Sequence, residues 1–211
     1  MADLTKVPKL FTSGSPAGYQ VGPGKYTAVM SLEKKRSESS FEIAPDPRND
    51  LTTRYDRQQD MLKEIYDATN ELYGSVNSIR SVRNQLQGIT KNVKGMNNTE
   101  KLVEAGEAAI EALSDWEKSV VALKLETFQD VVNFDSGLDA DLKELMSKID
   151  GSGPVVSEGS RDRFRDLMKD WDERESEFDT IVSEHVDGYN DLYREMNIPA
   201  VIVKEEKNSR N

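Results

Sequence analysis

The chain of 211 residues contains no cysteine and a single histidine, His185. Without thiols it can form no disulfide, no thiolate nucleophile and no cysteine-ligated zinc or iron–sulfur site. One imidazole also argues against a histidine-rich metal centre and against a Ser-His-Asp triad. We therefore assign no catalytic residue, no metal ligand and no cofactor-binding residue. We expect that the chain by itself is not an enzyme and has no cofactor.

Long apolar runs are also missing. The longest, Ala200–Val203, is far shorter than the roughly 20 residues that span a bilayer. The first 30 residues lack the basic segment and apolar core of a signal peptide. We expect no membrane insertion. The missing signal indicates a cytoplasmic location only if Met1 is the natural start, so the compartment stays open.

Positive charge is scarce relative to negative charge. The 28 lysines and arginines face 39 acidic residues, which gives a formal net charge of −11. Such a balance argues against a nucleic-acid backbone or an anionic membrane surface as the partner. Hydrophobic residues make up 36% of the chain, enough for a core if they are patterned.

Proline is concentrated in residues 1–48, which hold five of the seven prolines. In this stretch the apolar side chains of Tyr26, Ala28, Met30 and Leu32 alternate with the residues between them, as in a strand. A polar patch, 33–37, separates them from a second alternating pair, Phe41 and Ile43. The pattern predicts a β-hairpin, with the Gly-Pro-Gly-Lys sequence at 22–25 as a turn that enters its first strand. Two strands bury too little to be stable alone, so the hairpin needs further packing.

From Asp50 the apolar period becomes helical. The first predicted helix begins after an N-cap at Asn49-Asp50 and ends at 95–98. The second begins near Thr99, lapses across 128–137, resumes at Leu138 and stops at 151–154. The third runs from about Ser160 to 197–199, followed by an apolar tail, 198–203, that we expect to fold back. The apolar stripes are, in order, Leu62, Ile65, Thr69, Leu72, Val76, Ile79, Arg83, Leu86 and Val93; Leu102, Gly106, Ala109, Leu113, Trp116, Val120, Leu123 and Thr127; Leu138, Leu142, Leu145 and Ile149; and Phe164, Met168, Trp171, Glu175, Phe178, Val182, His185, Tyr189, Leu192 and Met196.

These elements predict a mainly α fold, an elongated antiparallel three-helix bundle that is kinked and coiled-coil-like. A small β-hairpin element precedes it. The predicted domains are a β element with an irregular N-terminal segment over 1–48, a helical bundle over 49–197, and a tail over 198–211. The lapse at 128–137 predicts a kink with the rings of Phe128 and Phe134 buried.

Polar residues on the predicted stripes favour structural roles. Glu175 and Arg83 predict a buried ion pair or hydrogen-bonded cluster that sets helix register. His185 is typical of a partly buried packing residue, and Trp116 and Trp171 of core residues rather than ligand platforms. Several acidic pairs lie on helices rich in Lys and Arg, where solvated i,i+4 pairing is expected. They are Asp139/Asp141, Asp170/Asp172, Glu173/Glu175 and Glu205/Glu206.

Several strings of residues together resemble one family. The sequences at 23–27, 41–43 and 45–48 resemble the closing hairpin of an Ig-like domain in large bacterial proteins with sortilin-like (VPS10-type) BNR-repeat β-propellers, often labelled glycosyl hydrolases. The helical region that follows is similar to the helical C-terminal region of those proteins. The similarity rests on Asn77, Ile79, Arg80, Arg83-Asn84-Gln85-Leu86, Gln129-Asp130, Asn133-Phe134, Leu138, Leu142, Tyr189-Asn190, Leu192 and Ile198-Pro199-Ala200.

The resemblance covers residues 20–203 and includes neither the propeller nor the earlier Ig-like strands. It implies a non-catalytic C-terminal spacer or protein-interaction module of an exported protein. Its partner would be the parent propeller protein, or a second copy that binds through the unpaired β element. Two alternatives stay open: a carbohydrate- or peptide-binding accessory domain of an exported hydrolase, and a stand-alone cytoplasmic helical adaptor.

Overall fold

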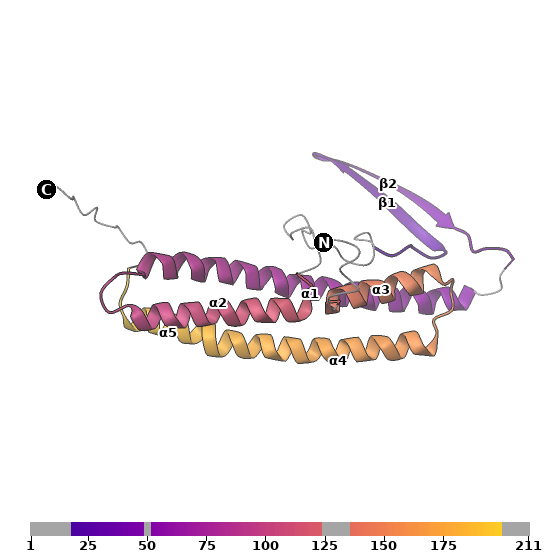
Figure 1. Ribbon diagram of the computed structural model, residues 1–211. Helices are drawn as coiled ribbons and strands as arrows, with labels where there is room; N and C mark the ends of the chain where they lie inside the picture. The colour runs from indigo at the N-terminus through magenta and orange to yellow at the C-terminus, as the bar shows by residue number, and fades with distance from the viewer. Residues whose placement is uncertain (1–17, 49–51, 124–135, 200–211) are drawn as a thin grey trace. The chain divides into compact units, whose positions relative to one another are not determined.

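A computed structural model describes residues 18–48, 52–123 and 136–199 of the chain (Figure 1). As the sequence predicts, the chain is mainly helical, and a two-stranded antiparallel hairpin precedes the helices. The elements are β1 (Gly24–Leu32), β2 (Lys35–Ile43), α1 (Thr52–Val93), α2 (Glu100–Val120), α3 (Leu138–Gly151), α4 (Glu158–Ile181), η3 (Val182–Val186) and α5 (Asp187–Glu195). None of the helices in the described part of the chain is long and apolar enough to cross a membrane.

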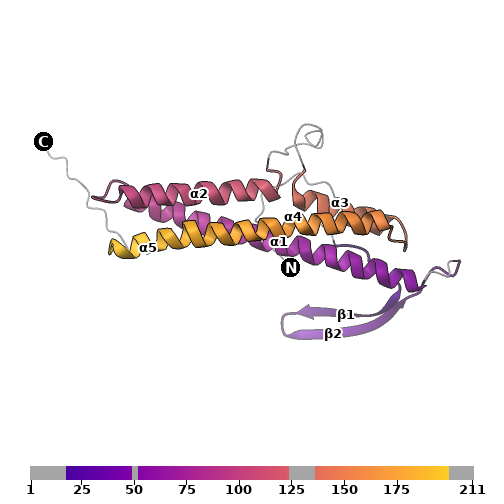
Figure 2. The same cartoon turned by 90° about the horizontal axis from the view of Figure 1, so that it is seen from below.

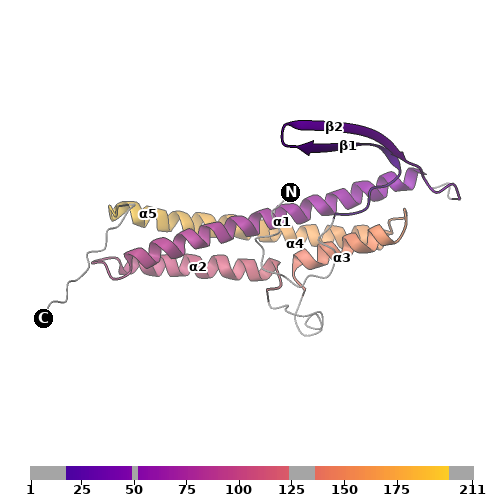
Figure 3. The same ribbon diagram turned by 90° about the horizontal axis from the view of Figure 1, so that it is seen from above.

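The hairpin pairs β1 with β2 in one continuous register, from Gly24 opposite Ile43 to Leu32 opposite Lys35. Figure 3 shows the two strands side by side. The predicted polar separation at 33–37 is too long, because only two residues form the turn and β2 already begins at Lys35. A two-residue turn needs positive φ, which Glu33 adopts at +54°. The predicted turn at 22–25 is shorter than expected: Pro23 forms a bend, and Gly24 and Lys25 already belong to β1.

Helix α1 confirms the first predicted stripe. Its apolar members are buried, with Leu62, Ile65 and Leu72 fully so, and Arg83 is half-buried. The helix ends at Val93, followed by Gly95 with φ of +89°. Thr99 then closes the connection to α2, because its hydroxyl donates to the carbonyl of Val93 at 2.9 Å. The predicted N-cap at 49–50 lies outside the described residues.

Helix α2 ends earlier than its stripe predicts. It stops at Val120, and Leu123, which we expected on the packed side, is 38% exposed. Helix α3 begins at Leu138, where the predicted pattern resumes, and buries Leu142, Leu145 and Ile149. The predicted kink, with Phe128 and Phe134, lies outside the described residues.

The last predicted helix begins two residues early, at Glu158, and contains a π-helical turn at Val182–Val186. The predicted seam is wrong in places before this turn, because steps of three and of four residues both keep a side chain near one face of a helix. Glu175 is exposed although the seam includes it, and Leu167 is buried although the seam omits it. The predicted end is confirmed: α5 stops at Glu195, and Asn197 has φ of +52°.

The chain forms two compact units, and the boundary between them falls inside α1. The first unit holds the described residues up to Gly74 and those of Val120–Trp171. The second holds Ser75–Ser119 and the described residues from Asp172 onward. Figures 1 and 2 show α3 beside the first part of α1, and α2 beside its second part.

Each unit has its own set of buried apolar side chains. In the first unit they are Met61, Leu62, Ile65, Ala68, Leu72, Tyr73, Val120, Val121, Leu138, Ala140, Leu142, Leu145, Met146, Ile149, Val156, Leu167 and Trp171. In the second unit they are Val76, Ile79, Leu86, Val93, Leu102, Ala109, Leu113, Trp116 and Tyr189. Hydrophobic burial of this kind is the main favourable term in folding.

In the first unit, the segment that enters the hairpin is fixed to the helices by backbone hydrogen bonds. The amide of Gln20 donates to the carboxylate of Asp150 at 3.1 Å, and its carbonyl accepts from Gln59 at 3.2 Å. The ring of Tyr19 lies edge-on to Tyr66, with 5.8 Å between centroids. These contacts secure the base of β1.

Candidate functional site

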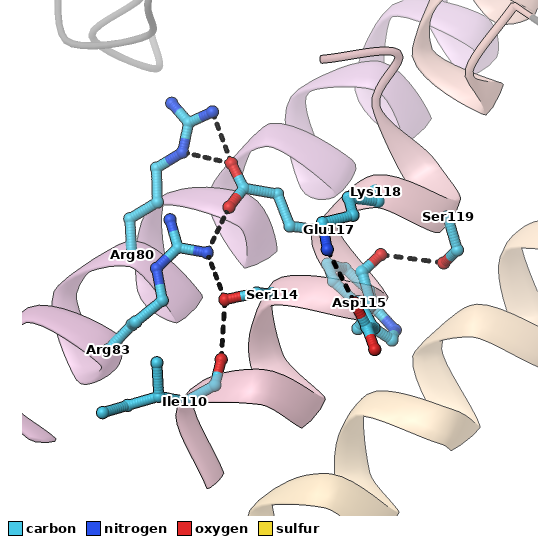
Figure 4. A network of polar contacts seen from close by, with 9 residues as sticks. Arg80, Arg83, Ile110, Ser114, Asp115, Glu117, Lys118 and Ser119 are labelled. Atoms are coloured by element: carbon cyan, nitrogen blue, oxygen red, sulfur yellow. Dashed lines mark hydrogen bonds and ion pairs between the residues drawn. The ribbon is translucent and has the colours of Figure 1, made fainter. Parts of the chain in front are cut away.

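Glu117 of α2 forms a buried ion cluster with two arginines of α1 (Figure 4). Its side chain is 1% exposed, and its Oε1 lies 2.5 Å from the guanidinium of Arg80. Its Oε2 lies 2.7 Å from Nη1 of Arg83, which also donates to the hydroxyl of Ser114 at 3.2 Å. The arginine side chains are 15% and 21% exposed, so they reach water while the carboxylate does not.

The predicted partner of Arg83 is therefore wrong. We expected Glu175, but that residue is exposed, and the carboxylate beside Arg83 belongs to Glu117. The predicted kind of contact is present, since the buried carboxylate of Glu117 on α2 pairs with arginines of α1. Such a pair is costly to break, because removal of one partner leaves a charge without compensation.

A second buried cluster lies in the first unit. Tyr73 of α1 donates a hydrogen bond to Oδ2 of Asp139 at 2.8 Å, and the ammonium of Lys143 lies 3.6 Å from the same oxygen. That ammonium also lies 4.8 Å from the centroid of the Tyr73 ring, within the range of a cation–π contact. Oδ1 of Asp139 has no hydrogen-bond partner among the described residues.

Burial decides the electrostatics of this second cluster. It raises the pKa of the Asp139 carboxyl and of the Tyr73 hydroxyl, and it lowers the pKa of the Lys143 ammonium, since each charged form loses water. The expectation of a solvated acidic pair is thus wrong for Asp139, whose side chain is 1% exposed. Asp141 lies nearer the surface, but it pairs with Arg163 of α4 at 2.7 Å rather than with a residue four positions along its own helix.

The chemistry available to these clusters is limited by access. The side chains of Asp139 and Lys143 are 1% and 9% exposed, so a substrate could not contact them without local opening. In the part of the chain that the structure describes, no three histidine, cysteine or acidic side chains are placed to hold a metal ion. His185 is half-buried within η3, in keeping with its predicted place on the packed side of the helix.

A groove in the second unit lies between α2 and α4, and we call it the α2/α4 groove. Its volume is about 460 Å³. It is lined by Ala112, Asp115, Trp116, Ser119, Ser176, Glu177, Thr180 and Ile181. The indole of Trp116 is fixed in place, because its Nε1 donates to the carbonyl of Arg174 at 2.6 Å and its ring lies 5.4 Å from that of Phe178.

Both tryptophans are core residues, as the sequence predicts. Trp116 is 3% and Trp171 is 2% exposed. This burial confirms the prediction that both pack in the core.

The hairpin carries exposed apolar side chains on one face. The register places Tyr26, Ala28, Met30, Leu32 and Phe41 together, and we call this set the apolar hairpin face. Met30 and Leu32 are each 72% exposed and Phe41 is 49% exposed. Tyr26 stacks on Phe41 with 5.8 Å between ring centroids, and its hydroxyl donates to the carbonyl of Gly22 at 2.7 Å.

Comparison with known proteins gives no match to any family model, to any curated protein or to any solved structure.

The sequence contains a weak signal for the Glu117 and Asp139 clusters, which the sequence pattern alone did not predict. Glu117 follows Leu113 by four residues, and Asp139 precedes Lys143 by four inside the stripe of Leu138, Leu142 and Leu145. A charged residue beside an apolar stripe can face either the core or solvent, because one helical step is about 100°. Only the structure shows which of them turn inward.

Proposed function

We propose that the chain is a non-catalytic spacer and protein-interaction module of a larger exported bacterial protein, and that its β-hairpin docks on a protein partner. The apolar hairpin face carries this proposal. The resemblance to the C-terminal region of sortilin-like BNR-propeller proteins supports it, since there the corresponding hairpin closes a larger β domain.

The apolar hairpin face is exposed to water. Two strands alone are marginally stable in water, and a large apolar patch on a soluble chain is typical of an interaction site. Met30 and Leu32 keep 72% of their surface exposed. Burial of such a side chain contributes about 1.5–3 kcal/mol, so a partner that covers this face is favoured.

The segment before the hairpin gives the face a firm base. Because Gln20 is hydrogen-bonded to Asp150 and Gln59, the start of β1 is held on the first unit. A held base lowers the entropy that docking costs, since fewer residues must be ordered when the partner binds.

The partner that we favour for the isolated chain is a second copy. An apolar face that is exposed on one copy is exposed on the other, so a two-fold dimer can bury both faces against each other. The net charge of −11 on each copy opposes this approach. Salt screens that repulsion, and the dimer should therefore strengthen as ionic strength rises.

The test is sedimentation equilibrium on the full chain and on two variants, Met30→Glu and Val29→Glu. The two residues are adjacent on β1 but point to opposite faces, and both are exposed. Each variant adds the same charge. We expect a dimer for the unchanged chain and for V29E. For M30E we expect a dissociation constant at least about 10-fold higher, which corresponds to a loss of about 1.4 kcal/mol of dimerisation free energy.

Two results would contradict the proposal. If the unchanged chain is monomeric at about 100 µM, a second copy is excluded as the partner, because a dimer with a dissociation constant below that concentration would be populated. Equal dissociation of M30E and V29E would exclude the apolar hairpin face as the site of contact.

We also propose the finer architecture that the sequence predicts, an elongated antiparallel three-helix bundle with coiled-coil-like packing. The length of α1, 42 residues, supports it, because a helix of this length runs about 60 Å. Small-angle scattering on the monomeric M30E variant should give a rod-like profile with a largest dimension above about 60 Å. A compact, near-spherical profile would contradict it.

A further inference from the structure

The α2/α4 groove lies on the side of α2 that faces away from α1. Glu117 of α2 points toward Arg80 and Arg83 of α1. Asp115 and Ser119, which line the groove, lie on the other side of α2 (Figure 4). One helical step is about 100°, so residues two positions apart in sequence lie about 200° apart around the helix axis. A partner can therefore reach the groove without disturbing the ion cluster between α1 and α2.

The groove has a length and walls that suit a further helix. Its lining on α2 runs from Ala112 to Ser119, about 10.5 Å or two helical turns. Small side chains line both walls, Ala112 and Ser119 on α2 and Ser176 and Thr180 on α4, and the distance between packed helices depends on the side chains at the contact. A helix also satisfies its own backbone hydrogen bonds, so it can enter an apolar groove without burying unpaired backbone groups.

The groove also has room for apolar anchors. Its apolar lining comes from Ala112, Trp116 and Ile181. A cavity of about 150 Å³ holds a benzene ring, so the groove volume of about 460 Å³ accommodates about three large apolar side chains. Residues at i, i+4 and i+7 on one face of a helix span two turns and supply that number. Because the Trp116 indole is already fixed by its hydrogen bond to Arg174, docking need not order it.

Negative charge dominates both walls of the groove. Helix α2 carries six acidic and two basic residues, and residues 172–181 of α4 carry five acidic residues and one arginine. Within the lining, the side chains of Asp115 and Glu177 are 64% and 52% exposed. Each pairs with a base on its own helix, Lys118 or Arg174, but exposed pairs of this kind contribute little to stability. These carboxylates can therefore exchange their present partners for cations of a docked helix.

This charge selects among possible occupants. A partner with cations beside its apolar face is favoured, because opposite charges speed the encounter and set the register of docking. A second copy of this chain is a poor occupant, since its helices carry the same negative charge and its net charge is also −11.

We propose that the α2/α4 groove binds a basic amphipathic helix of a partner protein. The apolar face of that helix enters the groove between Trp116 and Ile181, and its lysines or arginines lie beside Asp115 and Glu177. The proposal does not rest on the apolar hairpin face, because every residue that lines the groove belongs to the second unit and the hairpin belongs to the first.

The first test measures fluorescence anisotropy of three labelled peptides, each of about 18 residues or five helical turns, with the full chain. One peptide has leucine on one helix face and lysine elsewhere. The second has glutamate in place of lysine, and the third has the same leucines and lysines in an order without helical period. We expect the first peptide to bind with a dissociation constant at least about 10-fold lower than that of either other peptide.

The second test locates the binding with two matched variants of the full chain, Glu177→Arg and Asp179→Arg. Both residues are exposed on α4 and both substitutions change the charge by the same amount, but only Glu177 lines the groove. We expect E177R to raise the dissociation constant of the leucine–lysine peptide at least about 10-fold, and D179R to raise it less than about 3-fold. Circular dichroism checks that both variants keep their helical content.

Three results would overturn the proposal. If E177R weakens binding no more than D179R does, the peptide is attracted to the acidic chain in general and not to the groove. Equal binding of the peptide without helical period would show that an amphipathic helix is not what is recognised. Equal or tighter binding of the leucine–glutamate peptide would show that the acidic walls do not select a basic partner.

Discussion

The buried carboxylate of Glu117 offers the sharpest test of how the second unit is held together. Its two oxygens lie 2.5 Å and 2.7 Å from the guanidinium groups of Arg80 and Arg83. Glu117→Ala removes both ion pairs and leaves two cations facing each other. Loss of one partner of a buried pair costs about 3–5 kcal/mol. The two arginines are 15% and 21% exposed and can recover some water, so we expect about 3 kcal/mol.

The control is Glu107→Ala on the same helix. Glu107 pairs with Lys94 at 3.0 Å, but both side chains are more than half exposed, at 59% and 67%. An exposed pair contributes about 0–1 kcal/mol. Both variants change glutamate to alanine within α2, so differences in helix propensity cancel. We expect E107A to stay within about 1 kcal/mol of the unchanged chain.

The assay is urea unfolding followed by circular dichroism, with the free energy of unfolding from linear extrapolation. A double-mutant cycle with Arg83→Ala isolates the ion pair, because R83A should cost less in the E117A background than in the unchanged chain. If E117A unfolds at the same urea concentration as E107A, the ion cluster contributes no more than a surface pair, and our account of it is wrong.

Three further predictions follow from particular contacts. Gly106→Ala should destabilise by about 1–3 kcal/mol in urea unfolding, because a Cβ there would lie 2.3 Å from Oγ1 of Thr90 and 3.0 Å from Cε2 of Tyr189. Gly88→Ala, whose Cβ meets nothing within 4 Å on α1, should be neutral or stabilising by up to about 1 kcal/mol, and the same loss in both variants would contradict the reasoning. Burial raises the pKa of Asp139 in the folded chain above its ordinary value of 3.8, so the folded chain binds this proton more tightly than the unfolded chain. The protonated carboxyl therefore contributes to stability at low pH, and this contribution is lost as pH rises through the raised pKa. Asp139→Asn removes that gain, and urea midpoints between about pH 7 and pH 4 should fall more steeply for D139N than for the unchanged chain; parallel profiles would refute this. A panel of chromogenic glycosides and peptides should show no turnover by the purified chain, and turnover that a point variant of this chain abolishes would disprove its non-catalytic role.

The sequence predicts the elements well where one strong pattern acts alone. The stripe of Leu62, Ile65 and Leu72 predicts α1, and the alternation of Tyr26, Met30 and Leu32 predicts β1. Both patterns follow from geometry, since side chains repeat every 3.6 residues in a helix and every 2 in a strand. The sequence also predicts the helix ends that are followed by glycine or proline, as at Gly95 and Pro199.

Sequence reasoning fails where a step of three or of four residues is equally possible, or where a charge turns inward. Glu175, four residues after Trp171, is exposed, whereas Arg174, three residues after Trp171, is half-buried. Glu117 and Asp139 look like ordinary surface acids because each lies on a helix with other charged residues within four positions, Lys118 and Lys143 among them. What buries them is the position of Arg83 and of Tyr73 on another helix, and that depends on packing across the unit.

The most direct test of the central claim, that the hairpin is where a partner docks, is amide hydrogen exchange of the full chain measured at rising protein concentration. An uncovered two-stranded hairpin opens readily, so its amides exchange fast when the chain is dilute. We predict that exchange across β1 and β2 slows as concentration rises to about 100 µM, while exchange in α1 stays unchanged. Hairpin exchange that is fast at every concentration would contradict the claim.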